Sequence, residues 1–283
     1  MAEIAAVRPS PIAGTWYEGR PGSLTREVDT YISEAHLPAL QGEVIGLVAP
    51  HAGHRYSGPV AGYAFAAARG LSPGVVAVLS PMHQPHPGTL LTSAHQAYAT
   101  PLGNVPVDQQ SLFALDTQLR KDLGEGLTPV AYDREHSLEI ELPFLQRALS
   151  GPFSLLPVMV RTVTPRVSRA LGSALAEVLR GRSCLLVAST DLSHYYPQSE
   201  ANAMDSEMLA RLEAFDPDGL FEAEATGRGQ ACGLGALGAI LWAARSLGAD
   251  TVKVLRHATS GDVTGDYSSV VGYGAAAILK SKS

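Results

Sequence analysis

The chain has 283 residues, of which 46% are hydrophobic, and a net charge of −6. A sequence of this length can bury a large core, as one α/β domain or as two. The acidic balance argues against a nucleic-acid-binding protein, which usually has a basic face, and the longest apolar stretch, residues 234–244, is too short to span a bilayer. Because the N-terminus lacks the features of a signal peptide and two cysteines do not make a disulfide framework, we expect a cytoplasmic protein.

The first half of the chain alternates predicted helices with short apolar strands. Residues 1–22 are irregular, and Ser23 is a candidate N-cap for a helix that continues to about residue 35. A strand at 44–49 leads through a loop, which we expect to reach Pro59, into a helix at 60–69. A second strand covers 75–80. Turn residues within 89–108 favour an irregular strand or hairpin there, followed by a short helix at 108–116.

The second half repeats the alternation. Ser137 is a candidate N-cap for a helix whose leucines share one face. Further strands and helices are predicted in turn, with strands at 154–160, 184–188, 251–256 and 269–279 and helices at about 167–178, 199–214 and 232–247. No linker divides these elements. The sequence therefore predicts a single α/β domain over residues 1–283, with a central, mostly parallel or mixed sheet flanked by helices.

Three of the predicted strands end in loops that carry histidine. His51 follows the strand at 44–49, His83 follows the strand at 75–80, and Asp191 and His194 follow the strand at 184–188. Strands this apolar are typical of a parallel sheet that is buried on both faces. In such sheets ligands bind outside the carboxyl ends of the strands. We therefore expect these side chains to meet at one edge, as a metal site or an acid–base apparatus.

Cys232 lies where a helix is predicted to begin, a position that favours the thiolate. Cys184, inside an apolar strand, is expected to be a core residue. Two imidazoles and one anionic ligand can hold a redox metal, and a thiolate ligand admits copper, iron or zinc. Asp191 can orient the imidazole of His194 or bind metal itself. His54 and His86 lie further out in their loops, and an ordinary loop role is the alternative for each.

In these segments the chain resembles the Memo family, which includes the Memo-like protein B of bacterial and archaeal AmmeMemoRadiSam systems. The matching stretches are residues 11–17, 49–53 (APHAG), 80–83 (SPMH), 135–139 (EHSLE) with Leu142-Pro143, 189–194 (STDLSH), and Cys232-Gly233. The resemblance implies a fold like that of the LigB-type class III extradiol dioxygenases. Gly53-His54 stands where the family has glycine-tyrosine, and Met82 with Gln84-Pro85-His86 is also unusual.

The resemblance also implies iron or copper as the metal, with His51, His83 and Cys232 as its ligands. His194 falls where the related dioxygenases carry an acid–base histidine, with Asp191 beside it. Cys232 replaces the dioxygenase carboxylate ligand, which counts against ring cleavage. Partners from the same gene system, the radical SAM and AMMECR-like proteins, are implied in the same way.

Three hypotheses follow for function. The first is a Memo-type oxidoreductase that depends on iron or copper, with zinc as a further option; Glu135 and His136 would support the ligands, and His194 with Asp191 would move a proton. The second is a metal-free hydrolase with Cys232 as nucleophile, His194 as base and Asp191 as orienting group. The third is a non-enzymatic protein that binds a small molecule or a peptide in the same cleft.

Overall fold

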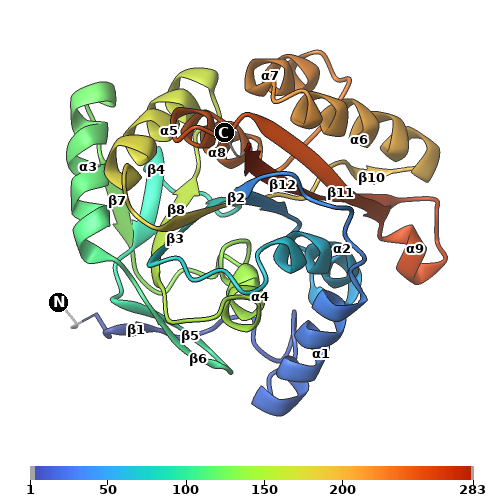
Figure 1. Cartoon of the computed structure of the whole chain (residues 1–283), viewed down its shortest axis with the longest axis horizontal. Helices are drawn as coiled ribbons and strands as arrows, with labels where there is room; N and C mark the ends of the chain where they lie inside the picture. The colour runs from blue at the N-terminus through green and yellow to red at the C-terminus, as the bar shows by residue number, and fades with distance from the viewer. Residues whose placement is uncertain (1–3, 282–283) are drawn as a thin grey trace.

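In the computed structural model, residues 4–281 are described, and a nine-stranded mixed sheet forms the centre of the molecule (Figure 1). Four neighbouring strands in the middle of the sheet run parallel, in the order β2 (Glu43–Ala49), β9 (Cys184–Ser189), β3 (Val75–Pro81) and β8 (Ser154–Val160). They are built from Val, Leu and Ala and are almost wholly buried, as expected for strands covered on both faces.

Antiparallel strands extend the sheet on both sides of this parallel centre. Next to β2 lies β12 (Val270–Lys280), which pairs in turn with β11 (Thr251–Thr259) and β10 (His194–Tyr196). On the other side β4 (Leu90–Ser93) runs antiparallel to β8, and β7 (Leu127–Val130) completes the sheet. This arrangement confirms the predicted α/β class with a mixed sheet, and it is consistent with the dioxygenase-like fold that the resemblance implies.

Helices cover both faces of the sheet (Figure 1). One layer contains α5 (Pro165–Leu179), α6 (Gln198–Glu213), α7 (Pro217–Ala225) and α8 (Leu234–Ser246), with α3 (Gln109–Leu123) beside α5. The other contains α1 (Pro21–Glu34), α2 (His54–Ala67) and α4 (Leu142–Ala148). Helix α8 is apolar on every side because it packs between the sheet and both α5 and α7.

A second, three-stranded sheet attaches the N-terminal segment to the domain. It consists of β1 (Val7–Arg8), β5 (Ala97–Thr100) and β6 (Gly103–Pro106). The last two strands form the hairpin that the turn residues of 89–108 predict. The remaining short elements are the 3₁₀ turn η1 (Glu139–Glu141) and α9 (Gly261–Thr264).

Two helix starts differ from the sequence-based expectation. The loop after β2 does not reach Pro59, because α2 begins at His54 and includes that proline. At the sixth position of the helix, Pro59 removes one backbone hydrogen bond and crowds the preceding turn, a cost that the packing of α2 against α1 and the sheet offsets. Helix α1 begins at Pro21 rather than after Ser23, since the fixed φ of proline suits a first helical position.

Two further expectations for helices were wrong. The hydroxyl of Ser137 does not cap a helix; it donates to the carbonyl of Pro81 instead. Helix α3 is not short, because its apolar face continues to Leu119 and it ends only at Gly124, whose left-handed φ of 80° closes the last turn.

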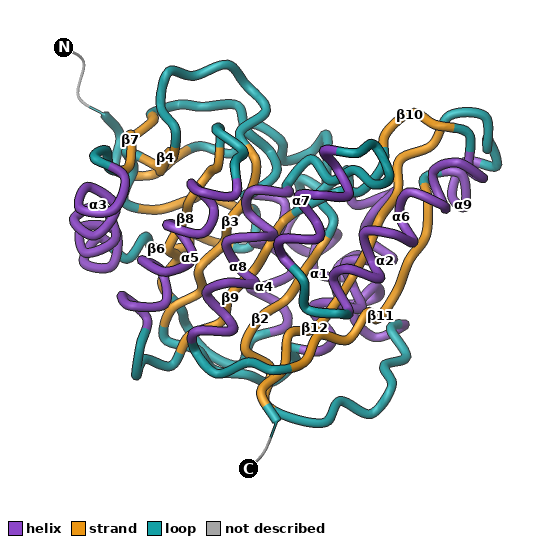
Figure 2. The backbone as a smooth tube through the Cα atoms, turned by 90° about the horizontal axis from the view of Figure 1, so that it is seen from above, coloured by secondary structure: helices purple, strands orange, loops and turns teal. Residues whose placement is uncertain are grey.

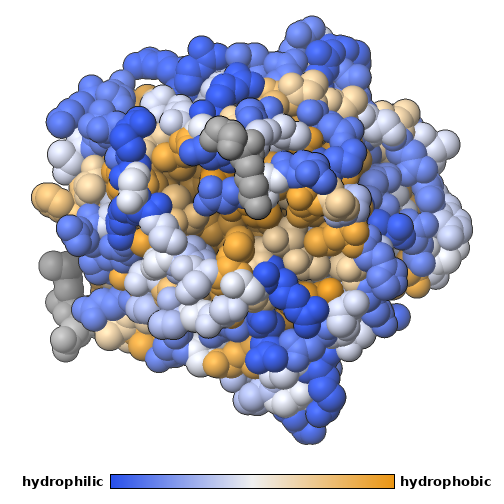
Figure 3. Space-filling model, in the orientation of Figure 1, coloured by the Kyte–Doolittle hydropathy of each residue, from blue (hydrophilic) through white to orange (hydrophobic). Residues whose placement is uncertain are grey.

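The loops after the parallel strands gather at one edge of the sheet, opposite the edge where the C-terminus lies (Figure 2). Figure 3 shows the face that carries the C-terminus, where apolar side chains occupy the middle and hydrophilic ones the periphery. None of the helices in residues 4–281 has the length and apolar character needed to cross a membrane.

Candidate metal centre

Three imidazoles meet at the carboxyl edge of the parallel strands. His51 follows β2, His83 follows β3, and His136 comes from the loop between β7 and η1. One ring nitrogen of each lies within 4.8 Å of the others, so the group is able to hold a metal ion. The structure thus brings the two strand-end histidines together, as the sequence predicts. It adds His136, for which only a supporting role was expected.

Cys232 joins this cluster through His51. Its Sγ lies 3.1 Å from His51 Nε2 and accepts the backbone N–H of Asp191 at 3.2 Å. The following residue, Gly233, allows this approach, because a Cβ at that position would lie 2.4 Å from the carbonyl oxygen of Ser189. Burial raises the pKa of the Cys232 thiol, and the nearby Asp191 adds to the effect. Without a metal ion the group is therefore a neutral thiol.

Glu135 fixes His83. Its carboxylate accepts the backbone N–H of His83 at 2.7 Å and lies 2.9 Å from His83 Nδ1. It also accepts the backbone N–H groups of His136 and Ser137. Burial alone would raise the pKa of Glu135, but the hydrogen bond with His83 and these other contacts hold it well below its usual range. A carboxylate in this state accepts a hydrogen bond from the Nδ1–H of His83, so Nε2 is the nitrogen that can bind a metal ion.

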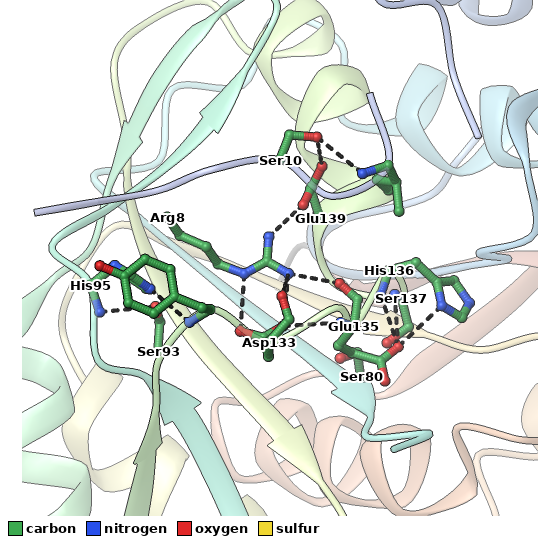
Figure 4. A network of polar contacts seen from close by, with 12 residues as sticks. Arg8, Ser10, Ser80, Ser93, His95, Asp133, Glu135, His136, Ser137 and Glu139 are labelled. Carbon is green, nitrogen blue, oxygen red and sulfur yellow. Dashed lines mark hydrogen bonds and ion pairs between the residues drawn. The ribbon is translucent and has the colours of Figure 1, made fainter. Parts of the chain in front are cut away.

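The loop that carries Glu135 and His136 is held by Arg8 of the N-terminal segment (Figure 4). The guanidinium donates to both carboxylate oxygens of Asp133, at 2.7 and 3.0 Å, and to the carbonyl of Glu135 at 2.8 Å. It also pairs with Glu139, whose other carboxylate oxygen accepts the hydroxyl of Tyr17. All of these groups are buried. The position of His136 therefore depends on a residue more than 120 positions earlier in the chain.

His136 is stacked between two other rings. Its centroid lies 4.0 Å from that of Trp16 and 4.8 Å from that of His83, with the two imidazole planes inclined by only 12°. Burial lowers the pKa of His136 to about 4, despite the neighbouring Glu135. Burial also lowers the pKa of His51 well below its usual range, and the two other histidines add to this. His51 and His136 are thus neutral at pH 7, the state in which imidazole binds metals.

Asp191 contacts His51 rather than His194. Its Oδ1 accepts the backbone N–H of His51 at 2.7 Å, and its Oδ2 lies 4.0 Å from His51 Nε2. Burial raises the pKa of Asp191 to about 7. A carboxyl group with this pKa exchanges its proton near neutral pH.

His194 lies beyond the three-histidine cluster. Its Nδ1 donates to the carbonyl of Leu192 at 2.8 Å, which leaves Nε2 as the basic nitrogen. Burial lowers its pKa. The next residue, Tyr195, is exposed and has a φ of +66°, a conformation that is uncommon for bulky side chains and that Tyr132 and Phe215 also adopt.

His54 and His86 stay outside the cluster. His54 is buried in the first turn of α2, where Nε2 lies 3.2 Å from the carbonyl of Ile140 and the ring packs against Phe144. His86 accepts the backbone N–H of Gly88 within its own loop. Both have the ordinary structural role that was the alternative for each.

Comparison with known proteins agrees with the motifs. The family model described as "Memo-like protein" matches residues 8–277. A MEMO1 family protein of Nitrosopumilus maritimus is 32% identical over 273 residues, which cover 95% of this chain and 98% of that protein. MEMO1 family proteins of Methanothermobacter thermautotrophicus and Thermotoga neapolitana are each 35% identical, with 94% of this chain and 98% of each relative covered. The chain therefore belongs to the Memo family.

Proposed function

We propose that this protein holds an iron or copper ion on His51, His83 and Cys232 and uses it in an oxidoreductase reaction. The observation that carries the proposal is the 3.1 Å approach of Cys232 Sγ to His51 Nε2, beside three imidazole nitrogens that lie within 4.8 Å of one another. Imidazole and thiolate suit iron, copper and zinc, whereas calcium and magnesium prefer oxygen ligands.

The hydrogen bonds of the cluster fit such an ion. A metal-binding histidine usually donates its other N–H to a carboxylate or carbonyl, and His83 has Glu135 in that place. Cys232 would give up its proton on binding, since the thiolate is the ligand form. A bound iron or copper ion would supply one-electron redox chemistry.

His136 suits a supporting role better than that of third ligand. Its ring is stacked on that of His83 with nearly parallel planes. Two ligands of one ion direct their lone pairs at one position, which nearly parallel rings do less readily than inclined ones. The planes of His51 and His83 are inclined by 80°. We therefore propose Cys232 as the third ligand, with His136 and Trp16 keeping His83 in place.

His194 and Asp191 are the groups we assign to proton transfer. His194 has Nε2 free, and the carboxyl group of Asp191 has a pKa of about 7, which suits exchange near neutral pH. A pocket of about 350 Å³ is lined in part by Tyr195, which follows His194 in the chain, and by Tyr273. A small molecule or the side chain of a peptide would bind there.

The metal-free hydrolase has less support. That hypothesis needs His194 next to Cys232, but the thiol faces His51. It also needs Asp191 to orient His194, but that carboxylate accepts the backbone N–H of His51. The raised pKa of Cys232 also disfavours the thiolate, which is the form that a cysteine nucleophile needs.

Elemental analysis of protein purified without chelator tests the proposal. We expect about one iron or copper per chain in the wild type, and loss of that metal in His83→Ala and Cys232→Ser. His86→Ala is the matched control, because His86 lies in the same loop as His83 but outside the cluster, and it should keep its metal. Full metal content in Cys232→Ser with loss in His136→Ala would replace Cys232 by His136 as a ligand. A metal-free wild type that cannot be loaded would refute the proposal.

A further inference from the structure

Ser189, at the end of β9, has three polar neighbours. Its Oγ lies 2.9 Å from His51 Nδ1, 2.6 Å from the carbonyl oxygen of Ser137 and 2.7 Å from Glu141 Oε1. Ser189, Ser137 and Glu141 have no exposed surface, and His51 has almost none. Water therefore does not complete these contacts, and the four groups must satisfy one another.

Counting protons leaves one arrangement that satisfies all three contacts. A hydroxyl has one proton to donate and two lone pairs to accept with. The carbonyl of Ser137 can only accept a hydrogen bond, so the hydroxyl of Ser189 donates its one proton to it. The other two neighbours must then donate to Ser189. If Glu141 were ionised, Ser189 would have one proton for two acceptors, the carbonyl oxygen of Ser137 and Glu141 Oε1. One of these oxygens would then face Ser189 Oγ without a hydrogen between them.

We propose that Glu141 carries a proton and donates it to Ser189, and that this chain of hydrogen bonds holds His51 with its proton on Nδ1. The lone pair of His51 Nε2 then faces Cys232 Sγ. Glu141 and Ser189 are in this view positioning residues, which act on the metal site through His51. The part of the inference that concerns metal affinity rests on the proposed function, whereas the assignment of the protons does not.

The surroundings of Glu141 agree with a neutral acid. Glu135 has four N–H contacts and Glu139 has Arg8, but in residues 4–281 no hydrogen-bond partner reaches Glu141 Oε2. The charged group whose electrostatic influence reaches Glu141 is Asp191, which is itself acidic. Burial therefore raises the pKa of Glu141 well above its usual range, and Asp191 adds to the effect.

The wrong tautomer would disturb two contacts at once. A proton on His51 Nε2 would face the sulfur and would have to leave before an ion could bind there. Nδ1 would then present a lone pair to Ser189, whose own proton is already donated to Ser137. Partners of this kind behind a metal ligand typically change metal affinity about 10–100-fold when they are removed.

Spectroscopy of the metal-free protein tests the proton assignment directly. The infrared difference between wild type and Glu141→Gln should show the carbonyl stretch of a protonated carboxyl group that only the wild type has. Nitrogen-15 NMR of the His51 ring should show Nδ1 protonated and Nε2 not. A carboxylate band in the difference spectrum, or a proton on Nε2, would overturn the inference.

Zn²⁺ titration against a competing chromogenic chelator tests the effect on the site. Glu141→Gln keeps a donor toward Ser189 and should bind Zn²⁺ within a few-fold of wild type, whereas Ser189→Ala and Glu141→Leu should bind about 10–100-fold more weakly. Equal weakening in Glu141→Gln and Glu141→Leu would contradict a donor role. A wild type with the expected proton pattern that binds neither Zn²⁺ nor iron nor copper would refute the metal proposal and support the proton assignment.

Discussion

Replacing Arg8 by methionine should lower the free energy of unfolding by about 3–5 kcal/mol, the usual result of removing one partner from a buried ion pair. The guanidinium makes two bonds to Asp133, one to the carbonyl of Glu135 and one to Glu139. The Arg8 and Asp133 side chains are only 1% and 2% exposed. Methionine fills part of the volume but leaves two carboxyl groups buried without their cation.

Arg147 offers a matched control. It forms the same two-pronged contact with a single aspartate, Asp29, with both bonds at 2.8 Å. Here the side chains are 38% and 43% exposed. Because water screens such a pair, Arg147→Met should cost no more than about 1 kcal/mol. The two variants therefore compare the same arginine–aspartate geometry in a buried pair and in an exposed pair.

Denaturant unfolding of wild type and both variants in one buffer measures the two losses of unfolding free energy. Comparable slopes of free energy against denaturant concentration check that the same transition is followed.

The pH dependence is a second test. Burial raises the pKa of Glu139 even with Arg8 present, and Arg8→Met should raise it further. Once the pH falls below about 4.3, the ordinary pKa of glutamate, Glu139 is neutral in both folded and unfolded chains. The deficit of Arg8→Met should therefore shrink in acid. Equal costs for the two arginines, or a deficit that grows in acid, would refute the reasoning.

Three other predictions concern the site. Native Glu141 keeps a proton that the unfolded chain releases above about pH 4.3. The free energy of unfolding of wild type should therefore fall relative to that of Glu141→Gln by about 1.4 kcal/mol per pH unit above that value. Free energies of unfolding that change with pH in parallel would mean that Glu141 has the same charge in the folded and unfolded states. His194→Gln should keep its metal by elemental analysis while turnover falls about 10²–10⁴-fold, and a metal-free variant would make His194 a ligand. Cys232 should react with an alkylating reagent faster after chelation than before it. Mass spectrometry can follow the labelling, with Cys184 as the internal reference. A labelling rate that does not change with chelator would argue against Cys232 as a ligand.

The sequence predicts best those parts of the molecule that depend on local pattern. The continuous apolar runs of β2, β3, β8 and β9 identify four parallel strands to within about a residue at each end. Since parallel strands share an edge, the same pattern brings His51 and His83 together. The start of α2 at His54 was missed because Pro59 is a breaker in sequence, whereas tertiary packing of the helix outweighs one lost hydrogen bond.

The rest of the site depends on contacts that no local pattern contains. His136 reaches the cluster because Arg8 and Glu135 hold its loop, and nothing in the loop sequence shows that an arginine 125 residues earlier will bind it. Trp16 and Glu141 were missed for the same reason. A signal existed in the run Glu135 to Glu141, where three acidic residues stand close to the apolar Leu138 and Ile140. Buried acids of this kind need partners, so such a run is a reason to look for a site.

The place of β12 in the sheet has a consequence for how the protein is made. This strand is synthesised more than 200 residues after β2, the strand that leads to His51, yet the two pair in the sheet. Until residues 270–280 are synthesised, β2 has an open edge on that side, and an open edge is a template for pairing with other chains. Cys232 is itself 181 residues away from His51. His51 can therefore meet Cys232 only after the intervening residues have been translated, and a truncation that removes β12 should yield a protein that aggregates instead of a smaller folded domain.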